Sequence, residues 1–175
     1  ELLGSQVERC NQILRRLSLN PIEEDDFIDE DLTMKNYLKE IVHSFQETSN
    51  KKFILNFDQD SNSKKITKSI EIVYGLRNFI GNANKFSKNK IFISLKSDLS
   101  FTEITIEDDG DGYPNDILSK IGEPYLKSLK NDHKSKIGLG LGLFIGKTLL
   151  EKNFAMLNFG NSQTRDGAEV NIKWK

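Results

Sequence analysis

The stretch Gly138-Leu139-Gly140-Leu141-Gly142 is central to the fold, because three alternating glycines stand directly before a segment with helical periodicity. A glycine-rich backbone that leads into a helix exposes N–H groups and the positive end of the helix dipole to an anion. The stretch therefore predicts a phosphate-binding loop followed by a helix over about residues 141–152.

Two common phosphate-binding motifs do not fit these glycines. Gly146-Lys-Thr148 has the ending of a P-loop, but the glycine required five residues earlier falls on Leu141. The dinucleotide-binding pattern Gly-x-Gly-x-x-Gly fails as well, because its third glycine falls on Leu143 or Ile145. The sequence supports neither of these phosphate folds.

A helix predicted over about residues 68–87 supplies a second group of candidate residues. Asn78, Asn82 and Lys85 are spaced by four and then three residues, so they share one face of that helix. An asparagine carbonyl suits Mg²⁺, and a lysine ammonium suits a phosphate. Taken alone, the same three residues fit equally well on the polar surface of an amphipathic helix.

Asp108 and the glycines that follow it form a third candidate wall. Asp108 is predicted to end a strand, and Gly110 and Gly112 allow the chain to turn and to approach a flat ring closely. A carboxylate only accepts hydrogen bonds, so it suits an exocyclic amine such as that of adenine. An ordinary Asp-Gly turn has the same residues, so this segment alone is weak evidence.

The composition is that of one globular domain with a short appendage. The 175 residues can bury a core without a disulfide or metal. One cysteine, Cys10, and two histidines are too few for an intrachain disulfide or a Cys/His zinc site. The net charge of −1 argues against nucleic acid as the main partner. No apolar run reaches membrane-spanning length.

Three regions are predicted along the chain. Residues 1–20 carry apolar side chains at a 4-3-4-3 spacing, which indicates the end of a coiled-coil-like dimerisation helix; an amphipathic helix lying on its own domain would show the same stripe. Residues 21–33 are acidic and contain Pro21, as in a linker. Residues 34–175 form the main domain. Because the chain begins at Glu1, we expect it to be a fragment of a longer protein.

The main domain mixes helical and strand patterns. Helices are predicted over about residues 33–49, with Thr33 as the cap, and over 68–87, 116–120 and 141–152. Strands are predicted over residues 52–57, 91–95, 101–107, 154–159 and 168–174, and residues 122–137 are predicted to form a long loop. We therefore expect an α+β, two-layer sandwich of a mixed sheet with helices on one face.

Together these segments resemble the catalytic ATP-binding (HATPase_c) domain of bacterial sensor histidine kinases, within the wider family that includes gyrase-type ATPases. Residues 76–87 are similar to the family's N box, and residues 108–112 match its first glycine box. Residues 122–125 resemble the start of the ATP lid, and residues 138–145 match the second glycine box. The resemblance implies the Bergerat/GHKL ATP-binding fold over residues 34–175.

The resemblance also implies roles for single residues, with ATP and Mg²⁺ as cofactors. Asn82 would ligate Mg²⁺, Asn78 and Lys85 would contact phosphate or metal, and Asp108 would accept from the adenine amine. The other residues that it implies at the nucleotide are Gly110, Gly112, Tyr125, Gly138, Leu139, Gly140, Leu141 and Gly142.

Asn78 separates two branches of the family. In the gyrase-like ATPases, the residue four positions before the magnesium-binding asparagine is a glutamate that activates water. An asparagine cannot act as a base, so Asn78 favours phosphoryl transfer over hydrolysis. Two alternatives stay open: a serine kinase of the anti-sigma type, and a nucleotide-free docking scaffold.

The phosphate acceptor is not evident in this sequence. His43 falls in a predicted helix and His133 in the presumed lid, so neither suits that role. The resemblance implies a histidine on an adjacent dimerisation helix of the same protein, a homodimer, a response regulator as partner, and a cytoplasmic location within an inner-membrane sensor kinase. A finer similarity to redox-responsive RegB/PrrB-type kinases would make Cys10 regulatory; a small apolar seam residue is the alternative.

Overall fold

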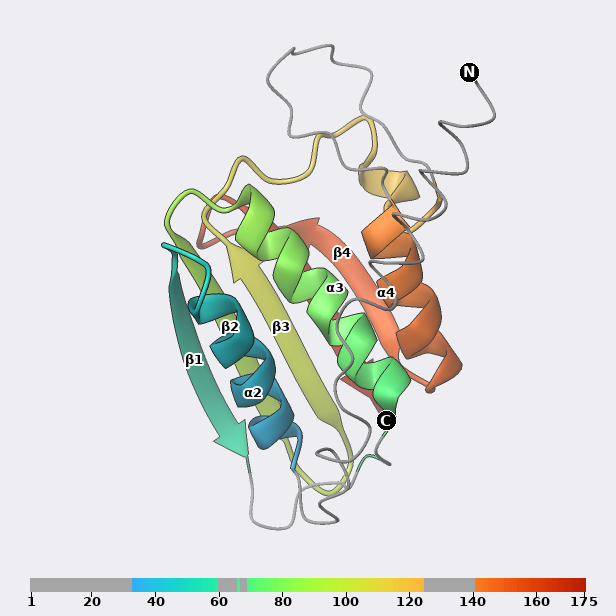
Figure 1. Cartoon of the computed structure of the whole chain (residues 1–175). Coiled ribbons are helices and arrows are strands. Elements are labelled where there is room, and N and C mark those ends of the chain that lie inside the picture. Colours follow the sequence, from blue (N-terminus) through green and yellow to red (C-terminus); the bar gives the residue numbers. More distant parts are fainter. Residues whose placement is uncertain (1–32, 60–65, 67–68, 125–140) are drawn as a thin grey trace, which may run out of the picture. The chain divides into compact units, whose positions relative to one another are not determined.

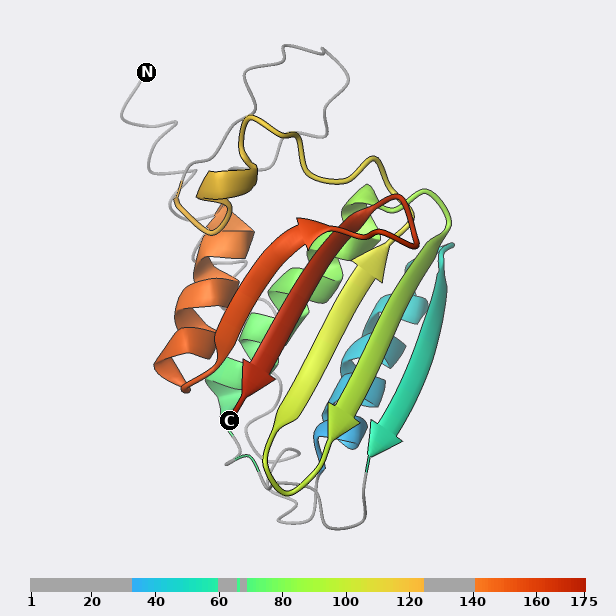
Figure 2. The same ribbon diagram turned by 180° about the vertical axis from the view of Figure 1, so that it is seen from behind.

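A mixed five-stranded β-sheet covered by helices on one face makes up the described part of the chain (Figures 1 and 2). The computed structural model describes residues 33–59, 66, 69–124 and 141–175. The chain divides into two units, Glu1–Leu32 and Thr33–Lys175, and the described residues all belong to the second. The dimerisation helix and linker predicted for residues 1–33 lie almost wholly outside them and stay a prediction.

The described residues of this unit form five strands and three α-helices. The strands are β1 (Lys52–Gln59), β2 (Lys90–Ser97), β3 (Thr102–Asp108), β4 (Met156–Asn161) and β5 (Ala168–Trp174). The helices are α2 (Met34–Gln46), α3 (Ile70–Phe86) and α4 (Leu141–Lys152), with a 3₁₀ turn, η1 (Leu118–Lys120). The predicted α+β sandwich with helices on one sheet face is confirmed.

The strand order is β1-β2-β3-β5-β4. β1 and β2 are parallel, and every other neighbouring pair is antiparallel. A parallel pair needs a long crossover, and α3 lies in the segment that connects β1 to β2. The crossover lays α3 across the sheet, and its C-terminal end lies at the same edge of the sheet as the end of β3 (Figure 1).

The core lies between the sheet and the helices. Buried and half-buried residues alternate along β3 and β5, as expected for strands with one covered face. On the helix side, α2 and α3 each bury one apolar stripe. The most deeply buried side chains include Leu38, Leu76, Phe79, Ile80, Ile91, Ile93, Leu95, Ile104, Ile106, Leu150 and Ile172.

Two glycines allow α3 and α4 to pack closely. A Cβ on Gly75 would stand 2.7 Å from Cγ of Leu150, and a Cβ on Gly146 would stand 3.0 Å from Cζ of Phe79. Both distances are shorter than normal contacts, so a larger residue at either position would separate the helices. Gly146 therefore serves helix packing, which agrees with the rejection of the P-loop pattern.

Some predicted details differ from the structure. Thr33 is the N-cap residue of α2, but its side chain makes no cap hydrogen bond, so the predicted side-chain cap is wrong. Its backbone oxygen instead accepts hydrogen bonds from the N–H groups of Asn36 and Tyr37. β4 begins at Met156 rather than near Phe154, because Phe154, with a positive φ of 64°, lies in the turn that closes α4 and donates its N–H to the Glu151 carbonyl.

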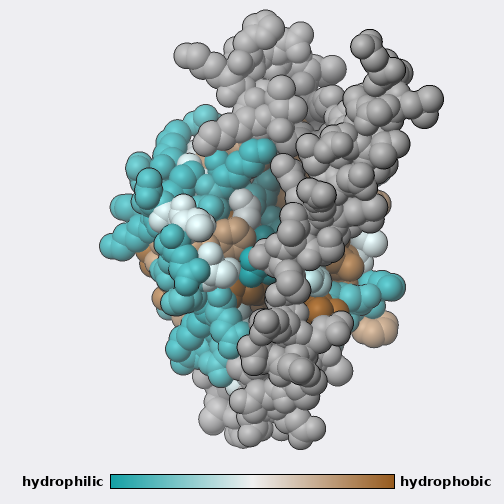
Figure 3. Space-filling model, viewed as in Figure 1, coloured by the Kyte–Doolittle hydropathy of each residue, from teal (hydrophilic) through white to brown (hydrophobic). Residues whose placement is uncertain are grey.

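The described surface on the helix side is mainly hydrophilic, with smaller hydrophobic areas between the polar side chains (Figure 3). Among the described residues, no helix combines the length and the apolar character needed to cross a membrane.

Candidate functional site

The candidate site begins with one face of α3. Its N-terminus is capped by Ser69, whose side chain accepts a hydrogen bond from the N–H of Glu71. The apolar stripe of the helix packs on the sheet, which leaves Asn78, Asn82 and Lys85 half-buried on the helix surface. These three residues lie on α3 within two turns of one another.

The two asparagines differ in their hydrogen bonding. Asn78 Nδ2 donates to the carbonyl oxygen of Tyr74, 2.9 Å away, which leaves its Oδ1 as an acceptor. The Asn82 side chain makes no hydrogen bond within the described ranges. A half-buried amide without a protein partner is suited to binding a ligand or metal ion.

The N-terminus of α4 meets α3 beside Asn78. A Cβ on Gly142 would stand 3.5 Å from Asn78 Oδ1, so glycine leaves the asparagine oxygen uncovered. The first N–H groups of a helix have no partner within the helix and attract anions. The Asn78 amide oxygen therefore lies beside the N-terminus of α4, whose first N–H groups have no partner within the helix. Thr148, by contrast, donates its hydroxyl to the Phe144 carbonyl within α4.

Asp108 ends β3 and is almost fully buried, with 3% of its surface exposed. Its Oδ1 accepts hydrogen bonds from the N–H groups of Gly110, at 2.8 Å, and Ala168, at 3.2 Å. Within the described ranges, Oδ2 has no hydrogen-bond donor. Burial raises the pKa of Asp108, although the two backbone donors act in the opposite direction.

Glycines enclose the Asp108 carboxylate. A Cβ on Gly110 would stand 2.6 Å from the Phe86 carbonyl oxygen, and one on Gly167 would stand 2.0 Å from the Asp108 carbonyl oxygen. No side chain fits at either position without moving the backbone. The carboxylate is thus held by neighbouring main chain, and its position does not depend on flexible side chains.

Asp109 joins the turn after β3 to the end of α3. Its carboxylate accepts from the N–H groups of Lys88 and Asn89 at 2.8–3.1 Å. Partial burial opposes its ionisation, but backbone donors outweigh this and lower the pKa of Asp109. Asp109 therefore ties the turn after β3 to the segment that follows α3.

The turn contains a residue that the sequence did not single out. Burial, with a further contribution from the Asp108 charge, raises the pKa of the Tyr113 phenol, so Tyr113 is neutral at physiological pH. Asn161 was missed as well, although it hydrogen-bonds to the Tyr113 backbone. No periodicity or motif marks Asn161, because it lies 48 residues away in β4.

Phe86 is a further residue that sequence reasoning missed. It is 49% exposed at the end of α3, and the Lys85 ammonium lies 5.2 Å from the centre of its ring. The signal in the sequence was the aromatic residue type directly after Lys85.

Several predicted contacts lie outside the described residues: Tyr125, Gly138, Leu139 and Gly140. Leu141 and Gly142, at the start of α4, are the described part of the predicted glycine loop. Cys10 and His133 also lie outside. His43 lies on α2 with its side chain largely exposed, 3.8 Å from Glu47, far from a buried catalytic setting.

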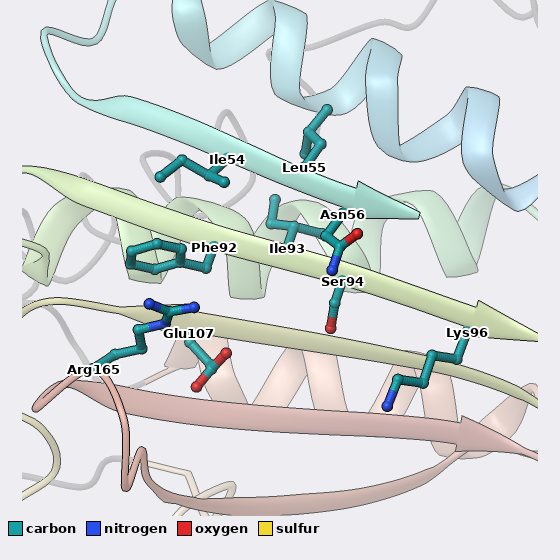
Figure 4. Close-up of a pocket in the computed structure, with 9 residues that line it drawn as sticks. All are labelled: Ile54, Leu55, Asn56, Phe92, Ile93, Ser94, Lys96, Glu107 and Arg165. Atoms are coloured by element: carbon teal, nitrogen blue, oxygen red, sulfur yellow. The ribbon is translucent and has the colours of Figure 1, made fainter. Parts of the chain in front are cut away.

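A hollow of about 550 Å³ lies on the sheet face away from the helices (Figure 4). The Arg165 guanidinium lies over the Phe92 ring there, 4.1 Å from its centre. None of the predicted site residues lines this hollow. Its lining is Ile54, Leu55, Asn56, Phe92, Ile93, Ser94, Lys96, Glu107 and Arg165.

Metal binding through carboxylates or histidines finds no support in the described ranges, which contain no group of three or more His, Cys, Asp or Glu that could hold an ion. A hard cation at this site would depend on the amide oxygens of α3 and on oxygens of a ligand.

Known proteins with similar sequences are sensor kinases. Sensor histidine kinase RegB of Cereibacter sphaeroides is 31% identical over 195 aligned positions, covering 99% of this chain and 41% of that protein. Sensor histidine kinase CssS of Bacillus subtilis is 33% identical over 89 positions, covering 51% of this chain and 18% of that protein. The chain thus spans less than half the length of these relatives.

Solved structures share the fold. The mycobacterial sensor histidine kinase MprB has a TM-score of 0.67 at 20% identity, over 82% of this chain and 94% of that one. Full-length ShkA in complex with AMPPNP has a TM-score of 0.64 at 20% identity, over 82% of this chain and 30% of that one.

The family model of histidine kinase-, DNA gyrase B- and HSP90-like ATPases matches residues 67–175, which include all three candidate walls. The chain therefore belongs to the family of histidine kinase-, DNA gyrase B- and HSP90-like ATPases.

Proposed function

We propose that this chain binds Mg-ATP and, within a longer sensor kinase, donates the γ-phosphoryl group to a histidine on an adjacent dimerisation helix. The observation that carries the proposal is the meeting of Asn78 with the N-terminus of α4 at Gly142, with Asp108 at the neighbouring strand end. Amide oxygens, helix N–H groups and a carboxylate match a metal ion, phosphates and an exocyclic amine respectively.

Each wall has a separate task in this proposal. Asp108 accepts from the adenine amine through Oδ2, the carboxylate oxygen that has no donor among the described residues. The Asn82 oxygen ligates Mg²⁺, assisted by Asn78, and Lys85 neutralises phosphate charge. The residues fit the metal because the Asn82 amide is half-buried and unengaged among the described side chains. Bound Mg²⁺ supplies charge neutralisation at the phosphates.

The proposed reaction transfers the γ-phosphoryl group to a nitrogen atom. An imidazole nitrogen of the acceptor attacks the γ-phosphorus, and the bond from that phosphorus to its bridging oxygen breaks. ADP leaves with the electron pair, and the imidazole releases its N–H proton to solvent. Asn78 supports transfer over hydrolysis, because a carboxamide that donates to Tyr74 and has no basic group cannot deprotonate water.

Calorimetry with Mg-ADP and a non-hydrolysable ATP analogue tests the binding step. Asn82→Ala should remove most of the affinity gained on adding Mg²⁺, and leave the metal-free affinity and the melting temperature unchanged. Asn89→Ala is the matched control, because the Asn89 side chain is exposed and makes no hydrogen bond among the described residues. Absence of nucleotide binding by the parent chain would overturn the proposal in favour of a docking scaffold.

The transfer step requires the acceptor. Incubating the chain with γ-labelled ATP and a separately expressed dimerisation domain should give label that acid removes and alkali preserves, as for phosphohistidine. Acid-stable label on serine would instead support a serine kinase. The homodimer, the response-regulator partner and a cytoplasmic location in a membrane-bound kinase belong to the same proposal, which the similarity to RegB supports.

A further inference from the structure

Asn161 holds the turn that follows Asp108. Its Oδ1 accepts a hydrogen bond from the Tyr113 N–H at 2.6 Å, and its Nδ2 donates to the Tyr113 carbonyl oxygen at 3.0 Å. One carboxamide thus satisfies both backbone groups of a single residue, in the way that a neighbouring strand would.

An ion pair joins the exposed Asp111 side chain of that turn to Lys88, but the backbone of the turn is bonded to Asn161. In the described part of the chain, no other hydrogen bond reaches the backbone of residues 111–113. Gly112 has a φ of +72°, and a Cβ there would stand 2.7 Å from Asn161 Oδ1. The asparagine is therefore packed directly against the glycine as well as bonded to the residue after it.

The same hairpin also holds Asp108. Asn161 is paired with Ala168 across the β4–β5 ladder, and the Ala168 N–H donates to the Asp108 carboxylate at 3.2 Å. The two ends of the glycine turn, Asp108 and Tyr113, are therefore anchored to facing positions of one hairpin. Figure 2 shows the β4–β5 connection beside the segment that follows β3.

We propose that Asn161 is a positioning residue for base recognition, an inference that rests on the proposed binding of an adenine nucleotide. By fixing the backbone of Gly112 and Tyr113 relative to Asp108, it sets how the exocyclic amine of the base meets the Asp108 carboxylate. The phosphate-facing groups of α3 and α4 lie on other elements, so loss of this contact affects recognition of the base and spares the phosphates.

The test compares Mg-ADP with Mg-IDP, whose hypoxanthine replaces the exocyclic amine with a carbonyl. Asn161→Ala and Asn161→Asp each remove the bond to the Tyr113 carbonyl, so the preference for Mg-ADP should fall about fivefold, as expected for one hydrogen bond. Affinity for Mg-IDP should change less than twofold. Asn158→Ala is the control, because Asn158 is exposed on the same strand and makes no side-chain hydrogen bond among described residues.

The possible outcomes separate this inference from the proposed function. Failure of the parent chain to bind Mg-ADP overturns both. Binding by the parent with an unchanged Mg-ADP preference in folded Asn161 variants overturns only the positioning role. Equal weakening of both nucleotides together with a lower melting temperature also overturns it, because this is the result of a purely structural contact.

Discussion

The backbone N–H of Ala168 donates to the carboxylate of Asp108, although 60 residues separate them in the sequence. Of the three walls of the candidate site, the one proposed to bind the base is thus assembled from β3 and from the β4–β5 hairpin. The α3 wall comes from a segment that precedes β3, and the α4 wall comes from a segment between β3 and the hairpin.

Asp108→Asn should weaken Mg-ADP binding. The loss of a charged acceptor for the adenine amine is expected to cost about 1.5–3 kcal/mol, or about 10- to 150-fold in affinity by calorimetry. Asp111→Asn provides the control, because Asp111 is an exposed carboxylate in the same turn. Equal affinities of the Asp108 variant and the parent would contradict the assigned role.

Nucleotide affinity should depend on pH through the same residue. Burial raises the pKa of Asp108 in the folded chain above its unfolded value, so its ionised form is lost on acidification earlier than for an ordinary aspartate. Affinity for Mg-ADP should therefore fall as the pH drops through this raised pKa. The free energy of unfolding responds to this group in the opposite direction: the contribution of Asp108 to stability falls as the pH rises, because ionisation of the buried carboxyl disfavours folding. The affinity of Asp108→Asn for Mg-ADP should not depend on pH over this range. If the parent and the variant show the same pH profile, the assignment is contradicted.

Gly75→Ala should destabilise the fold, because the new Cβ would stand 2.7 Å from Leu150 Cγ between α3 and α4. Overpacking of this kind costs about 1–3 kcal/mol in the free energy of unfolding, measured by denaturant titration. In a Leu150→Ala background the same change should cost clearly less. Gly160→Ala, where no atom lies within 4 Å of the added Cβ, serves as the comparison.

Phe154→Gly should stabilise the chain. Phe154 combines a φ of 64° with a side chain that is 91% exposed, so its left-handed backbone strain is not offset by packing. Relief of that strain is expected to raise the free energy of unfolding by about 1 kcal/mol. Phe154→Ala keeps a Cβ and should show no comparable gain; a similar gain in both variants would trace the effect to the lost aromatic ring.

Cys10 carries a prediction that concerns the longer protein. Oxidation of Cys10 should lower autophosphorylation, and Cys10→Ala should be equally active under oxidising and reducing conditions while the parent is not. A parent protein with equal activity in both conditions would remove the regulatory role.

The sequence predicted most of the fold because its signals are local. Period-two patterns in β2 and β3 and the stripe of α3 give the elements, and the glycines after Asp108 and before α4 mark two of the walls. The contacts of Ala168 and Asn161 were not predictable, since they depend on pairing between strands distant in sequence. Thr33 was correctly predicted as the N-cap residue of α2, but the orientation of its hydroxyl was not, because it depends on a side-chain rotamer that no local sequence pattern marks.

The long-range character of the base-binding wall has a consequence for how the chain matures. Its two anchoring contacts span 60 and 48 residues, and contacts of such separation are expected to form late in folding. A nascent chain that has released β3 but not yet the β4–β5 hairpin lacks both anchors of this wall. Under the proposed function, nucleotide would gain its full stabilising effect on the fold only after this hairpin has docked.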